Sequence, residues 1–528
     1  MSAPISQALL PTAMSDILQG AHDLVLNHPT FVNSCTQIEN QVNNNTGKAR
    51  PGLERLLDKS MRDAFHDSSA RWPPPLCHPG TRQYYIQKIA SWGVGASDQE
   101  KQILWVHGPA GIGKSAVAQS CANLFSAKKR LGAAVFLSRP NERNDPDRFF
   151  TSIAYQLAIR SRPFCDILDG QIQQDTTLVT KSIAEQFQDL LVNPISQLCA
   201  EGVDIGEWVV IVDGLDECRE KEGKEGKEAK NAKDIQCDII EIIATSVREN
   251  ALPFRWVFLS RPESHIVASF TADNMHQILL HFELPVTRVD DNEIRLFLTD
   301  ELQKIQKRSR LPDTWPPAHD IAILVNLSAG YWIYPAALVR FVRDHDSSPV
   351  DQLNAVLALV KGRSGKTSLG HPLAELDLFY TLIMRRVPSK ILPIIQRILL
   401  LFQHRTGNLG HWSHFTDPES RVSPPIIIAN LFGLSEMQFR SACSFLRSVL
   451  KFEPNDHTMT FYHASFMEFL ADATRSNEFC VCSCLNPLRR ELVERLNEIH
   501  ARSTSSMAPC TPFTLRRTHP YFSRSSGY

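Results

Sequence analysis

The chain has 528 residues, 43% hydrophobic and 21% charged, and is therefore long enough for about three globular domains. Its 56 basic and 57 acidic residues leave a formal net charge of -1, which gives no general attraction to nucleic acid or to an anionic membrane. No apolar run reaches membrane-spanning length, and the start of the chain carries no secretory leader pattern. We therefore expect a cytoplasmic protein with neither a membrane nor a nucleic-acid partner.

The first 85 residues predict a helical region followed by a proline-rich linker. The apolar pattern at the start is weakly helical, and three consecutive prolines, Pro73 to Pro75, later fix an extended path. Cys77 and His78 follow, but two ligand types without partners nearby predict an ordinary loop rather than a metal site. The cluster Cys480 to Cys484 lacks the paired C-x-x-C spacing of a zinc site, so we expect no metal there either.

A phosphate-binding loop is predicted between His107 and Ser115. The fixed positions of the pattern G-x-x-x-x-G-K-[ST] are filled, the run Ile103 to Val106 before it predicts a buried strand, and apolar residues at helical spacing follow. Backbone N–H groups at such a helix start, together with the helix dipole, favour an anion. We expect the nucleotide phosphates to contact the loop and the first helical residues, which are Gly108, Pro109, Ala110, Gly111, Ile112, Gly113, Lys114, Ser115 and Ala116.

Two of these residues have specific expected roles. Lys114 would reach the β- and γ-phosphates, and the hydroxyl of Ser115 would ligate Mg²⁺. A second Gly-Lys-Thr run, Gly365 to Thr367, has Val360 where the first glycine should stand, and no helical pattern follows it at once. That second run therefore predicts an ordinary loop.

Strands and helices then alternate, which predicts a parallel sheet covered by helices on both faces. A helix is expected at 86–92, before the strand that leads into the phosphate loop. The later strands are expected at 133–137, 208–212, 256–259 and 277–281, with helices at 146–159, 183–198 and 235–247. Asp145 can cap the first of these helices, and Pro146 suits the first helical position. The charged run from Arg219 to Lys233 predicts a solvated, mobile insertion.

Acidic residues follow the carboxyl end of the predicted strand 208–212. Ligands of open α/β sheets bind at that end, so Asp213 would hold Mg²⁺ together with Ser115. Asp216 or Glu217 could then orient the attacking water. These residues predict a site for a magnesium nucleotide.

Arg261 stands shortly after the predicted strand 256–259. At that position Arg261 can contact the γ-phosphate and so distinguish a triphosphate from a diphosphate. The alternative interpretation is a surface arginine paired with Glu263.

The second half of the chain predicts a helical part followed by a winged-helix outline. A helix start at 290–293 precedes an apolar stripe, and two more helices are expected at 321–328 and 334–342. The stripe consists of Ile294, Phe297, Leu298, Leu302 and Ile305. From Pro424 the expected order is helix, turn, helix 437–450 and a hairpin of 450–453 with 458–462.

A winged helix invites a DNA-binding interpretation. The basic residues on or next to the helix 437–450 are only Arg440, Arg447 and Lys451, which is too few for a basic stripe. We therefore favour a role in internal packing. The end of the chain, after about residue 476, shows at most one more short helix and no repeat array, and we expect disorder there.

The motifs together resemble the NACHT group of signal-transduction NTPases, which belongs to the STAND class, and are similar to NACHT proteins of mushroom-forming fungi. The resemblance rests on the loop Gly108–Ser115 and on the runs Asp213–Glu217 and Ser260–Glu263. It extends to 64–68 and 77–82 before the loop and to 149–157 after it, and covers roughly residues 60–475.

The resemblance implies a nucleotide-operated switch that binds ATP or ADP, with GTP as an alternative, together with Mg²⁺. It implies that His463, in the run Phe461–Leu470, reaches back to the β-phosphate of a bound diphosphate and holds a closed form. A lone histidine beside aromatics can also be a packed core residue, and that alternative stays open. Homo-oligomerisation on activation and protein partners through the N-terminal region are further expectations.

The predicted fold class is an α/β P-loop NTPase with a parallel sheet, followed by a helical lid and a winged-helix-like domain. The expected boundaries are 1–85 for the N-terminal region and linker, 86–289 for the NTPase core, 290–365 for the lid, 366–475 for the winged-helix-like domain and 476–528 for the tail. The leading hypothesis is slow, Mg²⁺-dependent nucleotide hydrolysis that sets domain packing. The alternatives are an interaction scaffold with little turnover and a metabolic P-loop transferase, which would need an acceptor pocket with its own base.

Overall fold

The structure is a computed structural model that describes residues 49–95, 101–220, 231–288, 291–344, 346–361, 373–404, 434–453, 458–482 and Arg490. The chain divides into two units, residues 48–484 and the two chain ends together, and all described residues except Arg490 belong to the first. The predictions for the weakly helical start of the chain, for the Gly365 loop, for the helix after Pro424 and for most of the tail lie outside the described residues.

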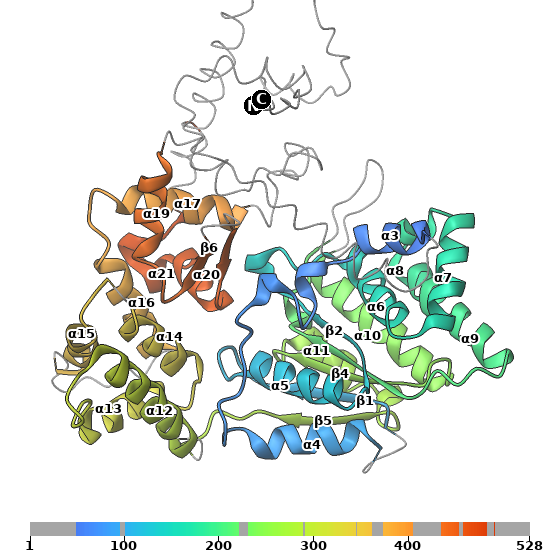
Figure 1. Cartoon of the computed structure of the whole chain (residues 1–528), viewed down its shortest axis with the longest axis horizontal. Helices are drawn as coiled ribbons and strands as arrows, with labels where there is room; N and C mark the ends of the chain where they lie inside the picture. The colour runs from blue at the N-terminus through green and yellow to red at the C-terminus, as the bar shows by residue number, and fades with distance from the viewer. Residues whose placement is uncertain are drawn as a thin grey trace, which may run out of the picture. The chain divides into compact units, whose positions relative to one another are not determined.

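A parallel sheet of five strands forms the core, as Figure 1 shows. The strands are β1 (Ile103–His107), β2 (Leu131–Phe136), β3 (Trp208–Asp213), β4 (Phe254–Ser260) and β5 (Leu279–Glu283), in the order β2-β3-β4-β1-β5. The predicted parallel α/β sheet is therefore confirmed. The last strand begins two residues later than predicted, because Leu279 is the residue that pairs with Ile103 of β1.

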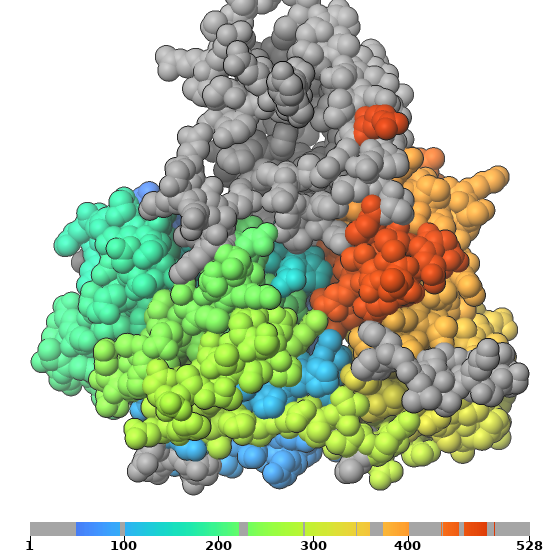
Figure 2. Space-filling model, turned by 180° about the vertical axis from the view of Figure 1, so that it is seen from behind, coloured from blue at the N-terminus to red at the C-terminus, as the bar shows by residue number. Residues whose placement is uncertain are grey.

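Each face of the sheet has its own hydrophobic core, because successive strand residues point to opposite sides. In β1, Ile103 and Trp105 join one core while Leu104 and Val106 join the other. Helices α4 (Gln83–Gly93) and α5 (Lys114–Ala127) cover the second of these faces, and α6 (Phe149–Ala158), α10 (Ala232–Arg248) and α11 (Ser264–Phe270) cover the first. The view from behind in Figure 2 shows the light green surface to which α10 and α11 contribute.

Several helices differ from the prediction in local detail. The region expected as one helix at 183–198 is α8 (Ile183–Phe187), a π-helical segment (Gln188–Val192) and α9 (Asn193–Ala200). Pro194 has no N–H for the regular helical bond, and the wider π turn accommodates its ring. Asp145 caps a short 3-10 turn, Pro146–Arg148, through the N–H of Asp147, and α6 follows.

Three helices of the core were not predicted, and one of them is α11. α3 (Pro51–Asp58) and α7 (Arg162–Gln174) pack against each other beside α6. Ser161 caps α7 and proline follows directly, so the start signal was present in the sequence. The N-terminal segment with α3 thus packs against the core and is more than a linker.

The expected charged insertion is shorter than predicted at both ends. Arg219 pairs with Asp145 at 2.9 Å, and Lys233 lies in the first turn of α10, which Asn231 caps. Residues 221–230 between these ends lie outside the described residues.

The second half is helical apart from a small hairpin, which precedes the last helices. Phe297, predicted in the buried stripe of α12, is only partly buried and instead contacts the rings of His78 and Trp332. The elements are α12 (Asp291–Ser309), α13 (Ala318–Ser328), α14 (Ile333–Val342), α15 (Pro349–Lys361), α16 (Ala374–Arg385), α17 (Leu392–His404), α19 (Glu436–Ser444), β6 (Leu450–Glu453), β7 (Thr458–Phe461), α20 (Ala464–Ala471) and α21 (Ala473–Ser476).

The order helix, antiparallel hairpin, helix is the one predicted for the winged-helix-like part. The helix predicted at 437–450 ends at Ser444, however, because the chain must turn before Leu450 pairs with Phe461 in the hairpin. Among the helices that the structure describes, we find none with the length and apolar character needed to span a membrane.

Candidate nucleotide site

The predicted phosphate loop joins β1 to α5. Gly111 and Gly113 have φ angles of 78° and 97°, in the left-handed region that glycine adopts without strain. A Cβ at Gly108 would lie 2.7 Å from the carbonyl oxygen of Leu284, so this position too requires glycine. The loop backbone therefore curls as the motif predicts, while the side chain of Ile112 is buried and anchors it in the core.

Lys114 reaches back over the loop from the first turn of α5. Its Nζ donates to the carbonyl oxygens of Gly108 at 2.7 Å and Pro109 at 2.9 Å. Burial lowers the pKa of this amine to about 8, against the opposing effect of Asp216. The positive charge thus lies at the mouth of the loop, beside the carboxylates that follow β3.

The residue at the end of β3, Asp213, is buried with 3% of its surface exposed. Its Oδ1 has no hydrogen-bond partner among the described residues, and the Ser115 hydroxyl bonds to the carboxylate. Burial raises the pKa of Asp213 to about 6. A hydroxyl and a carboxylate with an unsatisfied oxygen are donors that Mg²⁺ prefers, so these residues fit the ion.

The described residues contain no group of three or more histidines, cysteines or carboxylates that could hold a metal by themselves. This does not conflict with a magnesium site, because Mg²⁺ is usually held by one or two protein oxygens together with substrate phosphates and water.

The two acids after Asp213 have different environments. Gly214, with φ 78°, turns the chain into a short 3-10 segment, and a Cβ there would lie 2.8 Å from the oxygen of Leu137. Asp216 accepts from the backbone N–H of Arg261 at 3.0 Å and pairs with its Nε at 3.2 Å. Glu217 accepts from the N–H of Arg139 at 2.9 Å, and burial raises its pKa to about 7. Asp216 is thus committed to an ion pair, while Glu217 keeps acceptor capacity.

Arg261 follows β4, the strand between β1 and β3. Besides Asp216 it pairs with Glu468 of α20, with Nη2 and Oε1 2.6 Å apart. The alternative prediction of a pair with Glu263 is wrong, since Glu263 lies instead 3.8 Å from Nδ1 of His265. One arginine therefore links the acids of the core to the C-terminal helix.

His463 caps α20, as its predicted position at the helix start implies. Its Nδ1 accepts from the N–H of Ser465 at 3.0 Å, so the neutral ring carries its hydrogen on Nε2. Burial, Arg261 and Lys114 together lower its pKa to about 3. The ring is therefore uncharged and lies near the cations of the phosphate loop.

Several residues near the site were not predicted from the sequence. Arg71 is buried, lies 3.5 Å from the ring centre of Phe136 and donates to Oε1 of Gln119 at 2.6 Å. Its charge stabilises the ionised form of Asp213. No local periodicity points to such a residue, because it reaches the site from a 3-10 turn of only three residues, Ser69–Arg71.

The segment 77–82, predicted as a loop rather than a metal site, connects the phosphate loop to the helical part. His78 bonds to Asp300 of α12 at 2.8 Å, and the backbone N–H of Arg82 bonds to Glu293 at 3.0 Å. The Arg82 guanidinium donates to the oxygen of Ile112 in the loop at 3.1 Å. The resemblance at 77–82 was the available signal for this segment.

The helical part also contacts the phosphate loop directly. The N–H of Ile333, at the start of α14, donates to the oxygen of Gly111 at 3.0 Å. A Cβ at Gly111 would lie 2.5 Å from the side chain of Ile333, and Trp332 lies over Gly113. Movement of α14 therefore cannot leave the loop unaffected.

Comparison with protein families gives one match. The family model described as "Nephrocystin 3, N-terminal" matches residues 80–261, which contain the loop, β3 and β4. None of the curated proteins compared with the chain matches it.

Solved structures similar to the chain have low identities and low TM-scores. They include the ORC1 protein of Aeropyrum pernix in complex with DNA (13% identity, TM-score 0.35, 78% of this chain and 94% of that one). A STAND protein with a tetratricopeptide repeat sensor from Pyrococcus horikoshii has 11% identity and a TM-score of 0.36 over 78% and 46% of the two chains. Cdc6p of Pyrobaculum aerophilum has 12% identity and a TM-score of 0.34 over 83% and 99%. Likenesses this weak carry no inference about what this chain binds.

The family match, the sheet order with β4 between β1 and β3, and the glycine geometry of the loop agree with one another. The predicted resemblance is confirmed as a similarity: residues 80–261, which contain the phosphate loop, are similar to this NACHT-like family.

Proposed function

We propose that this protein is a magnesium-dependent nucleotide switch that binds ATP or GTP, hydrolyses it slowly, and transmits the state of the nucleotide to its C-terminal helices. The observation that carries the proposal is the position of Arg261, which pairs with Asp216 of the core and with Glu468 of α20 at the same time. A γ-phosphate would compete with these carboxylates for the guanidinium, because phosphate forms strong bidentate pairs with arginine. Triphosphate would thereby loosen α20, and diphosphate would leave it attached.

Binding would rest on the phosphate loop. The amine of Lys114 would exchange its two carbonyl acceptors for phosphate oxygens, which gain more from a cation than a neutral carbonyl does. The backbone N–H groups at the start of α5 would face the same anion. Ser115 and Asp213 would hold Mg²⁺, which neutralises phosphate charge during transfer.

In hydrolysis we assign the water-orienting role to Glu217 rather than to Asp216. Asp216 is held by Arg261 through backbone and side chain, whereas Glu217 has one backbone N–H as its hydrogen-bond partner among the described residues. The raised pKa of Glu217, about 7, suits a group that accepts a proton from water near neutral pH. Arg261 would stabilise the charge that develops on the γ-phosphate.

His463 would complete a diphosphate clamp. Its Nε2–H is a neutral donor, and its ring lies near Lys114 and Arg261. A bond from this N–H to a β-phosphate would hold α20 on the core in the diphosphate state. Release of α20 in the triphosphate state would free a surface for homo-oligomerisation, and the N-terminal region would recruit protein partners.

The test is a titration of the full chain with ATP and GTP, with and without Mg²⁺, followed by single-turnover hydrolysis. Asp213→Asn is expected to leave metal-free nucleotide binding intact, to weaken the Mg²⁺ complex by about tenfold or more, and to stop turnover. Glu217→Gln is expected to bind Mg²⁺-nucleotide normally and to retain the triphosphate.

Other outcomes would favour the alternative functions. Tight binding of Mg²⁺-ATP with no hydrolysis by the parent chain would favour a scaffold. Turnover that requires an added acceptor would favour a transferase. Equal hydrolysis by Glu217→Gln and the parent chain would remove Glu217 from the mechanism.

A further inference from the structure

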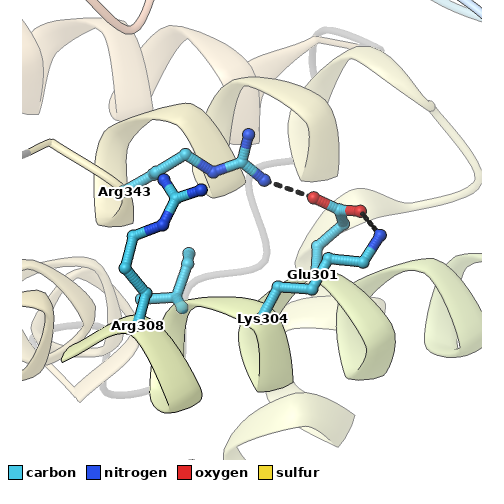
Figure 3. Close-up of a pocket in the computed structure, with 5 residues that line it drawn as sticks. Glu301, Lys304, Arg308 and Arg343 are labelled. Carbon is cyan, nitrogen blue, oxygen red and sulfur yellow. Dashed lines mark hydrogen bonds and ion pairs between the residues drawn. The ribbon is translucent and has the colours of Figure 1, made fainter. Parts of the chain in front are cut away.

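A cavity of about 300 Å³ lies in the helical part that follows the core, between α12 and the end of α14 (Figure 3). Four of its lining residues, Glu301, Lys304, Ile305 and Arg308, follow one another at helical spacing on one face of α12. The fifth, Arg343, is the C-cap residue of α14. Ile305 is buried and supplies the apolar wall, so the remaining lining is almost entirely charged.

The charges of this cavity do not balance. Glu301 uses one oxygen for Lys304 Nζ, at 2.6 Å, and the other for Arg343. Burial opposes its ionisation, but the two cations hold the pKa of Glu301 below its usual value. Three cations therefore face a single carboxylate, and two positive charges remain unmatched.

Arg308 is the cation that this carboxylate does not reach. No hydrogen bond or ion pair of its side chain occurs within the described part of the chain, and Figure 3 shows its guanidinium turned toward that of Arg343. The carbonyl ends of α12 and α14 explain why cations are tolerated here, but they do not explain why two arginines line the same cavity. Arginine stays charged at neutral pH, so neither group can relieve the repulsion by losing a proton.

We propose that the cavity binds a phosphate dianion, either inorganic phosphate or the phosphate of a small monoester, as a second anion site separate from the phosphate loop. A dianion would match the two unbalanced charges. The guanidiniums of Arg308 and Arg343 offer several free N–H donors in the planar arrangement that phosphate accepts in pairs. The volume lies at the lower end of the range for small-molecule sites and suits a phosphate with a small organic group.

The cavity lies between two helices that contact different parts of the core. α12 also carries Glu293 and Asp300, which contact the segment 77–82, and α14 begins at the phosphate loop. An anion that bridges Arg308 and Arg343 would fasten these two helices together. The cavity is therefore placed to stiffen the helical part against movement.

The experiment is a calorimetric titration of the full chain with inorganic phosphate at pH 7.5. Arg308→Ala is the decisive variant, because it breaks no hydrogen bond or ion pair of the described residues, and it is expected to weaken binding at least about fivefold. Lys307→Ala removes a neighbouring exposed cation of α12 that does not line the cavity, and is expected to bind like the parent. Arg308→Lys should restore binding only in part, since an ammonium cannot form the bidentate pair.

Phosphate could also enter the phosphate loop, so the titration is repeated with Lys114→Ala. Binding that survives in Lys114→Ala and is lost in Arg308→Ala supports the cavity, whatever the fate of the nucleotide proposal. Binding that is lost only in Lys114→Ala, or the absence of any binding by the parent chain, would overturn it.

Two further experiments identify the anion. A phosphate monoester has a second pKa of about 6, and that of inorganic phosphate is higher, so the binding of either should weaken from pH 7.5 to pH 5.5, whereas sulfate, which stays doubly charged, should not change. Vesicles of phosphatidylcholine with phosphatidic acid present the same monoester on a lipid. Arg308-dependent sedimentation with these vesicles would assign a lipid headgroup as the source, and binding of free phosphate without sedimentation would assign a soluble ligand.

Discussion

At the scale of single residues, Lys114 is the strongest test of the phosphate loop. It is the cation that the loop itself contributes, and its amine already lies among the loop carbonyls. Lys114→Ala should lower triphosphate affinity by more than about tenfold, since a charge-assisted hydrogen bond is worth about 1.5 to 3 kcal/mol. Isothermal titration measures the effect, with Lys128→Ala, an exposed lysine at the end of α5, as the matched control. Unchanged affinity would mean that the phosphates bind elsewhere.

His463 allows a second residue-scale prediction, which concerns pH. Its pKa falls from 6.5 to about 3 on folding, so below pH 6.5 the unfolded chain takes up a proton that the folded chain refuses. The stability that the neutral ring contributes is complete above pH 6.5 and is lost as the pH falls. At pH 5 the loss is at most about 2 kcal/mol. The melting temperature of His463→Leu should therefore depend less steeply on pH, between 7.5 and 5, than that of the parent.

The same variant separates the two roles of His463. If the ring clamps a diphosphate, His463→Leu should release ADP faster, which stopped-flow displacement measures. If the ring only packs and caps α20, ADP release should not change and only the melting curves should differ. The second result would contradict the proposal that His463 binds the diphosphate, but it would not contradict the pH prediction.

Much of the candidate site could be predicted at this scale because its residues lie in short consecutive motifs. Gly108 to Ser115 and Asp213 to Glu217 stand at strand ends, and strand ends are visible in the sequence as the end of an apolar run. Arg71 and Arg82 could not be found in the same way, since each reaches the site from a segment without periodicity. The partner of Arg261 was missed for a related reason. Glu468 is distant in sequence and becomes a neighbour only when α20 packs on the core.

At the scale of elements, the turn after β2 connects Glu217 with the C-terminal hairpin. Its Arg139 donates to Glu217, and the side chain of Asn141 forms two bonds with the backbone of Phe461 in β7, at 2.8 and 3.1 Å. Asn141 thus completes the edge of a short hairpin much as a neighbouring strand would. Two residues after Phe461 the chain reaches His463, so a shift of this turn would move the histidine.

This connection predicts that Asn141→Ala detaches β7 from the core. Loss of two hydrogen bonds of about 1 kcal/mol each should raise the exchange rate of the Phe461 amide by about tenfold or more. Hydrogen exchange read by mass spectrometry or NMR measures the change. Ser138→Ala is the control, because Ser138 bonds to the same Asn141 amide at 2.9 Å without touching the hairpin. Equal exchange in Asn141→Ala and Ser138→Ala would contradict the proposed connection.

The elements themselves were predictable where one physical signal dominated. All five strands of the sheet are buried apolar runs, and each was found within two residues. The region predicted as one helix at 183–198 contains a π-helical segment that was not predicted, because periodicity does not reveal how Pro194 is accommodated. The helix predicted at 437–450 was too long, since its apolar residues continue into the turn and into β6.

At the scale of the whole molecule, the domain boundaries remain proposals, and the packing of the N-terminal segment suggests a different start for the NTPase domain. α3 packs on α7, and Arg82 contacts the phosphate loop, so we propose that the NTPase domain begins near residue 49 rather than at 86. The predicted boundaries beyond 289 remain proposals. The expectation that nucleic acid is not a partner also stays a prediction. The basic residues of the winged-helix-like part make contacts within the chain: Arg447 pairs with Asp344 and Asp346, Lys451 donates to the oxygen of Trp72, and Arg440 lies over the ring of Phe452.

The last prediction concerns the contact between the core and α20. Glu468 is 38% exposed, so its pair with Arg261 contributes little to global stability, but it is the ion pair through which a γ-phosphate could act on α20. Glu468→Ala should therefore leave the melting temperature nearly unchanged and raise the population of the open, self-associating form in the presence of ADP. Light scattering coupled to size exclusion measures the mass with ADP and with a non-hydrolysable triphosphate.

The matched control is Glu478→Ala, which removes an exposed glutamate of the same C-terminal region whose side chain contacts neither Arg261 nor the loop. The parent and the control should be monomeric with ADP and larger with triphosphate, whereas Glu468→Ala should be larger with both nucleotides. A variant that stays monomeric with ADP and assembles with triphosphate like the parent would show that Arg261 and Glu468 do not carry the signal. In that case the contact of Ile333 with Gly111 would be the next route to test, because it joins the same loop to α14.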